Sequence, residues 1–134
     1  MGTSFEGEIW KMIYVFDLDG TLCETFPNPD GYGMKYFEAE PYYDRIEVVN
    51  KLWDEGHTII IETARGCGSK INHYEKTFEQ LRSWGLKFTS LRTGVKFGGD
   101  LFIDDKGVNS EDFFNGCSKQ NNKENSFVSS AGLL

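Results

Sequence analysis

The sequence contains few cysteines and no long apolar run. Its three cysteines, Cys23, Cys67 and Cys117, lack the paired spacing of zinc and iron–sulfur sites, so we expect free thiols in a reducing cytoplasm. No apolar run approaches the roughly 20 residues of a membrane-spanning helix. Residues 1–11 lack the basic start and apolar stretch of a secretory signal. These absences predict a cytoplasmic protein with no membrane partner.

Basic side chains are also outnumbered. The 134-residue chain has 14 Lys and Arg against 21 Asp and Glu, which gives a formal net charge of −7. Because this charge repels a phosphate backbone, nucleic acid is an unlikely partner, and local cations must hold any phosphorylated substrate. The length suits one domain of ordinary size.

Three short apolar runs have the composition of buried β-strands. They cover residues 12–16, 58–61 and 101–103, and polar side chains follow each of them closely. Apolar residues at both odd and even positions are typical of parallel strands that are buried on both faces. We therefore expect functional side chains where these strands end.

Apolar residues at helical spacing separate the strands. They predict helices over residues 42–55 and 71–84, each ending at a glycine. A short strand is expected over 86–91 and a short helix over 110–114. Strands that alternate with helices predict an α/β fold with a three-layer, doubly wound, Rossmann-like parallel sheet.

The domain organisation follows from composition. Residues 1–11 are an N-terminal extension, residues 12–116 form one catalytic domain, and the polar residues 117–134 are expected to form a flexible tail. Residues 24–41 are rich in proline, glycine and aromatic residues, which indicates an excursion from the core. The aromatic side chains in this excursion either stack on a ligand or close the edge of the core; they include Tyr32, Tyr36 and Phe37.

Two carboxylates follow the first strand, at Asp17 and Asp19. Phosphoryl transfer to a carboxylate needs a nucleophile, a cation and a group that moves a proton. We interpret Asp17 as the nucleophile and Asp19 as the general acid/base, with a turn at Gly20 that splays the two side chains. Thr21 can hold this loop by hydrogen bonding. Ordinary turn chemistry is the alternative interpretation of the same residues.

The segment Phe-Asp-Leu-Asp-Gly-Thr at residues 16–21 resembles the first motif of the haloacid dehalogenase (HAD) superfamily, and three further motifs follow in order. Thr63 is similar to the second-motif hydroxyl, which hydrogen-bonds a phosphoryl oxygen. Lys96 stands where the family places its third-motif lysine. The resemblance spans residues 12–114 and implies a HAD-like fold without a cap domain, because neither gap between motifs has room for one.

The acidic fourth motif is matched by Asp104 and Asp105, which follow residues 101–103. The resemblance implies that Asp105 binds the metal directly with Asp104 as its close companion, or the reverse. Together with Asp17 and Asp19 they would offer the oxygen ligands that Mg²⁺ prefers. Converging carboxylates would repel one another without a cation, so a Mg²⁺ cofactor is expected.

We assign substrate binding to Thr21, Ala64 and Arg65. The Arg65 guanidinium either forks onto a substrate phosphate or carboxylate or pairs with a structural aspartate. Lys96 either offsets charge at the nucleophile or is an ordinary surface lysine. Two features depart from the family pattern: the lysine is followed by Phe-Gly-Gly rather than proline, and Glu62 adds a charge beside the second motif.

These features predict a Mg²⁺-dependent phosphomonoester hydrolase that works through an aspartyl phosphate. The pattern is similar to small capless bacterial and phage proteins associated with capsule or carbohydrate biosynthesis, which favours a phosphorylated small molecule such as a sugar phosphate. The alternatives are a polynucleotide 3′-end phosphatase, which the net charge disfavours, and a non-catalytic phosphate-binding module. A homo-oligomer is one way to cover such an open site.

Overall fold

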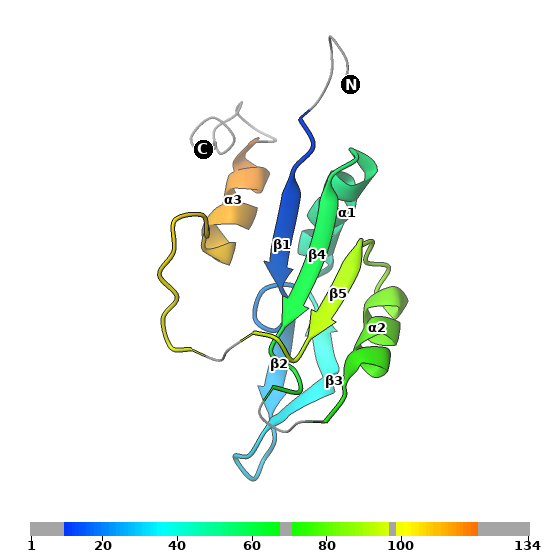
Figure 1. Cartoon of the computed structure of the whole chain (residues 1–134), viewed down its shortest axis with the longest axis vertical. Coiled ribbons are helices and arrows are strands. Elements are labelled where there is room, and N and C mark those ends of the chain that lie inside the picture. The colour runs from blue at the N-terminus through cyan, green and yellow to red at the C-terminus, as the bar shows by residue number, and fades with distance from the viewer. Residues whose placement is uncertain (1–9, 68–70, 97–98, 121–134) are drawn as a thin grey trace. The chain divides into compact units, whose positions relative to one another are not determined.

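The computed structural model describes residues 10–67, 71–96 and 99–120 (Figure 1). The chain divides into two compact units, the first ending at Lys96 and the second comprising the rest. We describe each unit by itself. The single domain expected over residues 12–116 is thus shared between two units. Most of the expected N-terminal extension and most of the expected tail lie outside the described residues.

The first unit contains a parallel sheet of three strands. These are β1 (Ile13–Asp17), β4 (Thr58–Thr63) and β5 (Ser90–Thr93), in the order β1-β4-β5. Strand β5 begins and ends later than the short strand that the sequence predicts over residues 86–91. The expected α/β fold with a parallel sheet is confirmed at this level of description.

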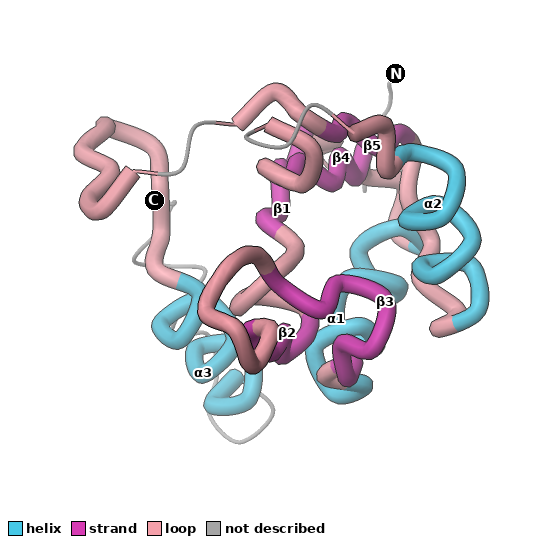
Figure 2. The backbone as a smooth tube through the Cα atoms, turned by 90° about the horizontal axis from the view of Figure 1, so that it is seen from below, coloured by secondary structure: helices cyan, strands magenta, loops and turns pink. Residues whose placement is uncertain are grey.

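The two faces of this sheet differ. Phe16, Ile61 and Leu91 lie in register across the strands, and all three side chains are buried. On the opposite face, Ile13 and Val15 are 68% and 57% exposed. Burial of the first strand on both faces was therefore a wrong prediction, because β1 is at the sheet edge and the described helices of this unit lie on one side of the sheet (Figure 2).

The two helices of this unit are α1 (Tyr43–Asp54) and α2 (Tyr74–Ser83), so both expected helices are confirmed with shorter ends. Ile46 and Val49 of α1 are buried, as is Leu81 of α2. Helix α1 packs against β4, while α2 packs against β5 and β3. No helix in the described ranges combines the length and the apolar character needed to cross a membrane.

An antiparallel hairpin forms the excursion expected over residues 24–41. Its strands are β2 (Cys23–Pro27) and β3 (Met34–Pro41), with an irregular register after Glu24. Ala39 packs inward, whereas Tyr32 at the turn is largely exposed. The hairpin follows the loop that carries Asp19, so it is placed to contribute backbone and aromatic groups beside that carboxylate.

The second unit contains helix α3 (Ser110–Gln120), with Phe114 buried. The helix expected over 110–114 therefore continues into residues 117–120, which the sequence assigned to a tail. The strand expected over residues 101–103 does not form, and these residues are 78%, 57% and 87% exposed. The described residues of this unit offer no partner strand, and a strand needs a partner to pair its backbone groups.

Candidate functional site

The candidate site lies at the carboxyl end of the parallel sheet. Asp17 ends β1, Thr63 ends β4, and Lys96 follows β5. Parallel strands end at the same edge, so three distant stretches of sequence meet there. The loop after β1 turns at Gly20, whose φ is +86° and whose N–H donates to the Cys23 carbonyl at 2.8 Å. This turn follows Asp19, and the two aspartates have different partners, Lys96 for Asp17 and Arg65 for Asp19.

Asp17 is partly open and has a cation beside it. Its Oδ1 atom lies 3.1 Å from Nζ of Lys96, and the two side chains are 35% and 28% exposed. The Thr21 hydroxyl donates to Asp17 Oδ2 at 3.3 Å. Arg45 of α1 fixes this loop by donating to the Thr21 carbonyl at 2.9 Å. Asp17 is thus a carboxylate that a ligand can reach.

Asp19 is held much more firmly. Arg65 donates to both of its oxygens, from Nε at 3.0 Å and from Nη2 at 2.8 Å. The hydroxyls of Thr25 and Thr63 donate to the same carboxylate. Burial by itself raises the pKa of Asp19, but the hydrogen bonds and charge of Arg65, with help from Thr25, outweigh it and hold the pKa below its ordinary value.

The Arg65 guanidinium is buried and fully engaged. Its Nη1 atom donates to Thr77 at 3.2 Å and to Gln80 at 2.7 Å, both on α2. The rings of Tyr36 and Phe37 lie 4.7 and 5.5 Å from its central carbon. A buried charge needs such partners. Of the two roles considered for Arg65, the structure shows pairing with an aspartate, and a substrate cannot reach the guanidinium in this arrangement.

A tight turn places Arg65 under the sheet edge. The Arg65 N–H donates to the Thr63 hydroxyl at 3.2 Å, and the Cys67 N–H donates to the Ala64 carbonyl at 2.8 Å. Gly66 has φ +87°, and a Cβ there would lie 2.6 Å from a backbone carbonyl oxygen. Ala64 therefore shapes the turn, and its expected contact with substrate stays a prediction.

The second unit carries the remaining candidates, Asp104 and Asp105. Asp104 closes its own turn by accepting hydrogen bonds from the N–H groups of Lys106 and Gly107, each at 2.6 Å. These bonds hold the pKa of Asp104 below its ordinary value. Asp105 is exposed, and its carboxylate lies 3.7 Å from Nζ of Lys106. Asp105 thus has the freer carboxylate of the two.

No group of three or more His, Cys, Asp or Glu side chains in the described ranges is arranged to hold a metal ion. Asp17 offers the partly exposed carboxylate oxygens that suit Mg²⁺. Both oxygens of Asp19 accept hydrogen bonds from Arg65, so the Asp19 side chain is occupied where the sequence assigned it to the metal. Both oxygens of Asp17 also have partners, Lys96 and the Thr21 hydroxyl, so Mg²⁺ at Asp17 would have to replace one of these contacts, and Mg²⁺ at the Asp19 side chain would have to replace Arg65.

The cysteines of this chain carry no evident chemistry in the site. None of the three is in a disulfide bond. The Cys23 thiol lies beneath Asp19, with Sγ 3.7 Å from Oδ1, and burial raises its pKa to about 11. Since a thiolate is the reactive form, Cys23 is not a nucleophile at neutral pH.

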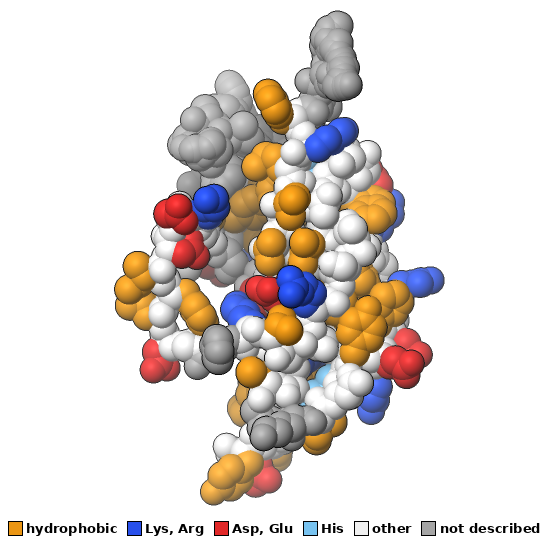
Figure 3. Space-filling view, viewed as in Figure 1, with side chains coloured by type: hydrophobic (Ala, Val, Ile, Leu, Met, Phe, Trp, Pro, Cys, Tyr) orange, Lys and Arg blue, Asp and Glu red, His pale blue; other side chains and the backbone are white. Residues whose placement is uncertain are grey.

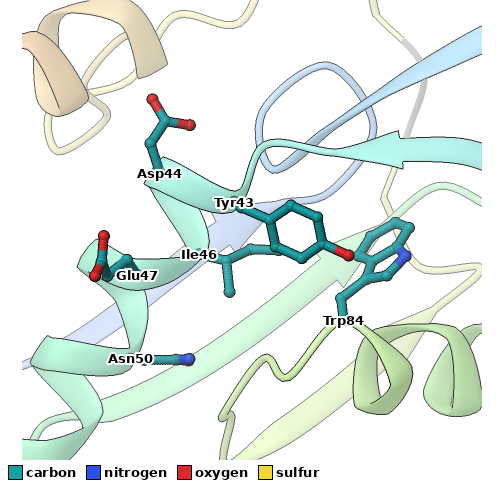
Figure 4. Close-up of a pocket in the computed structure, with 6 residues that line it drawn as sticks. All are labelled: Tyr43, Asp44, Ile46, Glu47, Asn50 and Trp84. Atoms are coloured by element: carbon teal, nitrogen blue, oxygen red, sulfur yellow. The ribbon is translucent and has the colours of Figure 1, made fainter.

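A shallow hollow of about 520 Å³ lies apart from the aspartates, between α1 and Trp84 (Figure 4). Figure 4 shows Tyr43 pointing toward Trp84, with the carboxylate of Asp44 on the same turn of α1 and that of Glu47 one turn further on. The Asn50 amide, which also lines the hollow, is already used, because it donates to the Gly85 carbonyl and accepts from the Lys87 N–H, both at 2.8 Å. This hollow contains none of the expected site residues.

The comparisons with known proteins define the fold only. No protein-family model matches the sequence, and no curated protein matches it significantly. The chain is similar to the crystal structure of a structural-genomics target from Vibrio cholerae, with 24% sequence identity and a TM-score of 0.63. The match covers 78% of this chain and 88% of that chain. A similarity at this level of identity supports the α/β fold and assigns no activity.

Sequence reasoning missed the residues that support Arg65. Thr25, Thr77 and Gln80 belong to no motif, yet they complete the hydrogen bonds of the buried ion pair. A signal was present for two of them: Thr77 and Gln80 are polar residues three apart on α2, each followed by an apolar residue, Phe78 or Leu81. Polar side chains on the buried face of a helix need partners, which indicates a buried polar group nearby.

Proposed function

We propose that this chain is a Mg²⁺-dependent phosphomonoester hydrolase of the HAD type, with Asp17 as its nucleophile. The observation that carries the proposal is the contrast between the partners of the two carboxylates at the sheet edge. Asp17 is partly exposed and has Lys96 at 3.1 Å, whereas Asp19 is held by a buried guanidinium. One carboxylate is free to react while the second is fixed beside it.

The proposed reaction has two steps. A carboxylate oxygen of Asp17 forms a bond to phosphorus while the bond to the leaving-group oxygen breaks, and water then hydrolyses the aspartyl phosphate to release inorganic phosphate. Lys96 offsets the repulsion between the two anions as they approach. The Thr63 hydroxyl lies at the same edge, but it is buried and donates to Asp19. Its proposed donation to a phosphoryl oxygen therefore requires it to exchange that hydrogen bond.

Asp19 is the proposed proton carrier. Pairing with Arg65 favours its ionised form, which is the form that accepts a proton from the attacking water. The same pairing lowers the pKa of Asp19, which weakens this carboxylate as a base, so proton transfer at Asp19 requires its contacts with Arg65 to loosen during the reaction. Donation of a proton to the leaving group requires Asp19 to be protonated first.

Mg²⁺ is the proposed cofactor. Asp17 would hold it, and the resemblance adds Asp105 with Asp104 as its close companion, or the reverse. When bound, the ion would neutralise part of the negative charge on the phosphoryl group. The proposed substrate is a phosphorylated small molecule such as a sugar phosphate.

A phosphate-release screen tests this proposal. Sugar phosphates, nucleotides and 3′-phosphorylated oligonucleotides would be incubated with the full chain in Mg²⁺ or in EDTA, with Asp17→Asn as the matched control. We expect release from a small molecule that requires Mg²⁺ and is absent in the variant, with an unchanged melting temperature. Release in EDTA, release by the variant, release from oligonucleotides alone, or binding of phosphate esters without release would contradict it.

A further inference from the structure

Three side chains lie in one row across the carboxyl end of the parallel sheet. The register aligns Asp17 of β1 with Glu62 of β4, and Glu62 with Arg92 of β5. Residues aligned in this way point to the same face, and two strand spacings place the Asp17 and Arg92 Cα atoms about 10 Å apart. The row therefore runs from the candidate nucleophile to an arginine on the neighbouring strands.

Arg92 is available to a ligand, in contrast to Arg65. Its side chain is exposed, and within the described ranges neither Arg92 nor Glu62 makes a side-chain hydrogen bond or ion pair. Figure 3 shows acidic and basic side chains next to each other at the centre of this sheet face, below a column of hydrophobic side chains. In a protein of net charge −7, an unpaired arginine beside the site is a specific place for an anion.

The charges of Asp17, Glu62 and Arg92, in this order along the row, favour some ligands over others. Asp17, with Lys96 beside it, takes the phosphoryl group that reacts. Glu62 repels an anion in the middle of the row but accepts hydrogen bonds from hydroxyl or amino groups. Arg92 offers a planar fork that fits a phosphate or a carboxylate.

We propose that the substrate carries two anionic groups separated by an uncharged polar stretch, and that Arg92 determines specificity by binding the second anion. This inference rests on the proposed function, because it takes Asp17 as the place where the phosphoryl group reacts. Arg92 belongs to none of the four motifs, so the motifs alone do not indicate this binding role.

Direct binding of matched phosphonates tests the inference. Phosphonates cannot be hydrolysed, so calorimetry on the full chain in Mg²⁺ measures binding whether or not the protein turns over a substrate. Hexylphosphonate has one anionic group, 6-phosphonohexanoate adds a distant carboxylate, and 1,6-hexanediphosphonate adds a distant phosphonate. Comparison of the last two probes shows whether the second site prefers a carboxylate or a phosphate-like group. In phosphonoacetate the two anionic groups are too close together to reach both Asp17 and Arg92.

The expected result is about tenfold tighter binding of one or both long dianionic probes than of hexylphosphonate, because one charge-assisted contact is added. Arg92→Gln should abolish this difference without changing the affinity for hexylphosphonate. Arg82→Gln is the matched control, since it removes an exposed arginine from α2, whose side chain lies over Phe78, and it should keep the difference.

Equal affinities for the three long probes in the unmodified protein would overturn the inference. So would an unchanged preference in Arg92→Gln, an equal loss in Arg82→Gln, or a preference for phosphonoacetate over the long dianions. Failure of the proposed function gives a different result, namely turnover that survives Asp17→Asn or no turnover at all, while the affinities of the phosphonates are still measured.

Discussion

Asp17 and Asp19 stand two residues apart and both are partly exposed, with 24% of the Asp19 side chain accessible, yet the cations that pair with them differ. The Asp17 side chain is 35% exposed and pairs with Lys96, which is itself partly exposed. Asp19 pairs through both oxygens with Arg65, whose side chain has no exposed surface. The comparison teaches that similar carboxylates in one short motif can have separate duties, one open to a ligand and one fixed by the fold.

The residues that hold the two cations, Arg65 and Lys96, in place also differ. Arg65 is held by Tyr36 and Phe37 of the hairpin and by Thr77 and Gln80 of α2, so its ion pair joins several elements. Lys96 comes from the segment just after β5. We therefore expect substitutions at the first pair to affect folding, and substitutions at the second to affect chemistry with little effect on folding.

Removal of the buried cation should have the largest effect on stability. Arg65→Met would leave the Asp19 carboxylate without its main partner, and we expect the free energy of unfolding to fall by about 3 kcal/mol. Urea denaturation followed by circular dichroism measures this change. Asp19→Asn added to Arg65→Met should recover part of the loss, because the unpaired charge is gone. A loss below about 1 kcal/mol in the single variant would show that the Arg65–Asp19 ion pair contributes little to the stability of the fold.

Removal of the exposed cation should spare the fold. Lys96→Met is expected to change the free energy of unfolding by less than about 1 kcal/mol, since the pair is partly exposed. Turnover should nevertheless fall by about 10²- to 10³-fold, because a charge beside the reacting groups is lost. Steady-state kinetics checks this, with Lys51→Met on α1 as a control that keeps full activity. Equal activity in the two variants would remove Lys96 from the site.

The smallest expected effect is a pH dependence of stability. The pKa of Asp19 in the folded chain is below its ordinary value of 3.8, so its ionised form stabilises the fold above that value. The contribution should be lost as the pH falls below 3.8 toward the folded pKa. Urea midpoints at pH 7, 5, 4 and 3 should therefore fall more steeply for the unmodified chain than for Asp19→Asn. Parallel curves would contradict the assignment.

The site residues that could be predicted from the sequence are those at or after the carboxyl ends of strands. Asp17 was chosen because it follows an apolar run, whereas Thr63 and Lys96 were assigned from the resemblance to the family motifs. Parallel strands bring their carboxyl ends together whatever the helices between them. The sequence could not decide whether Arg65 binds a substrate anion or pairs with an aspartate. Its partners on α2 are set by tertiary packing, which a local motif does not contain.

The sequence-based errors have a related cause. An apolar run such as residues 101–103 has strand composition, but a strand also needs a partner, and the described part of its own unit offers none. Arg92 was missed because the expected strand over 86–91 stopped one residue too early. With β5 running through Thr93, the alternation of buried Leu91 and exposed Arg92 becomes visible.

The central claim is that Asp17 is the carboxylate that becomes phosphorylated. The most direct measurement is to mix the full chain with p-nitrophenyl phosphate and Mg²⁺, quench in acid during turnover, and locate any added phosphate by peptide mass. We expect an adduct on the peptide that contains Asp17, at Asp17 itself, and neither an adduct nor turnover in Asp17→Asn. An adduct on another residue, or undiminished turnover in that variant, would contradict it.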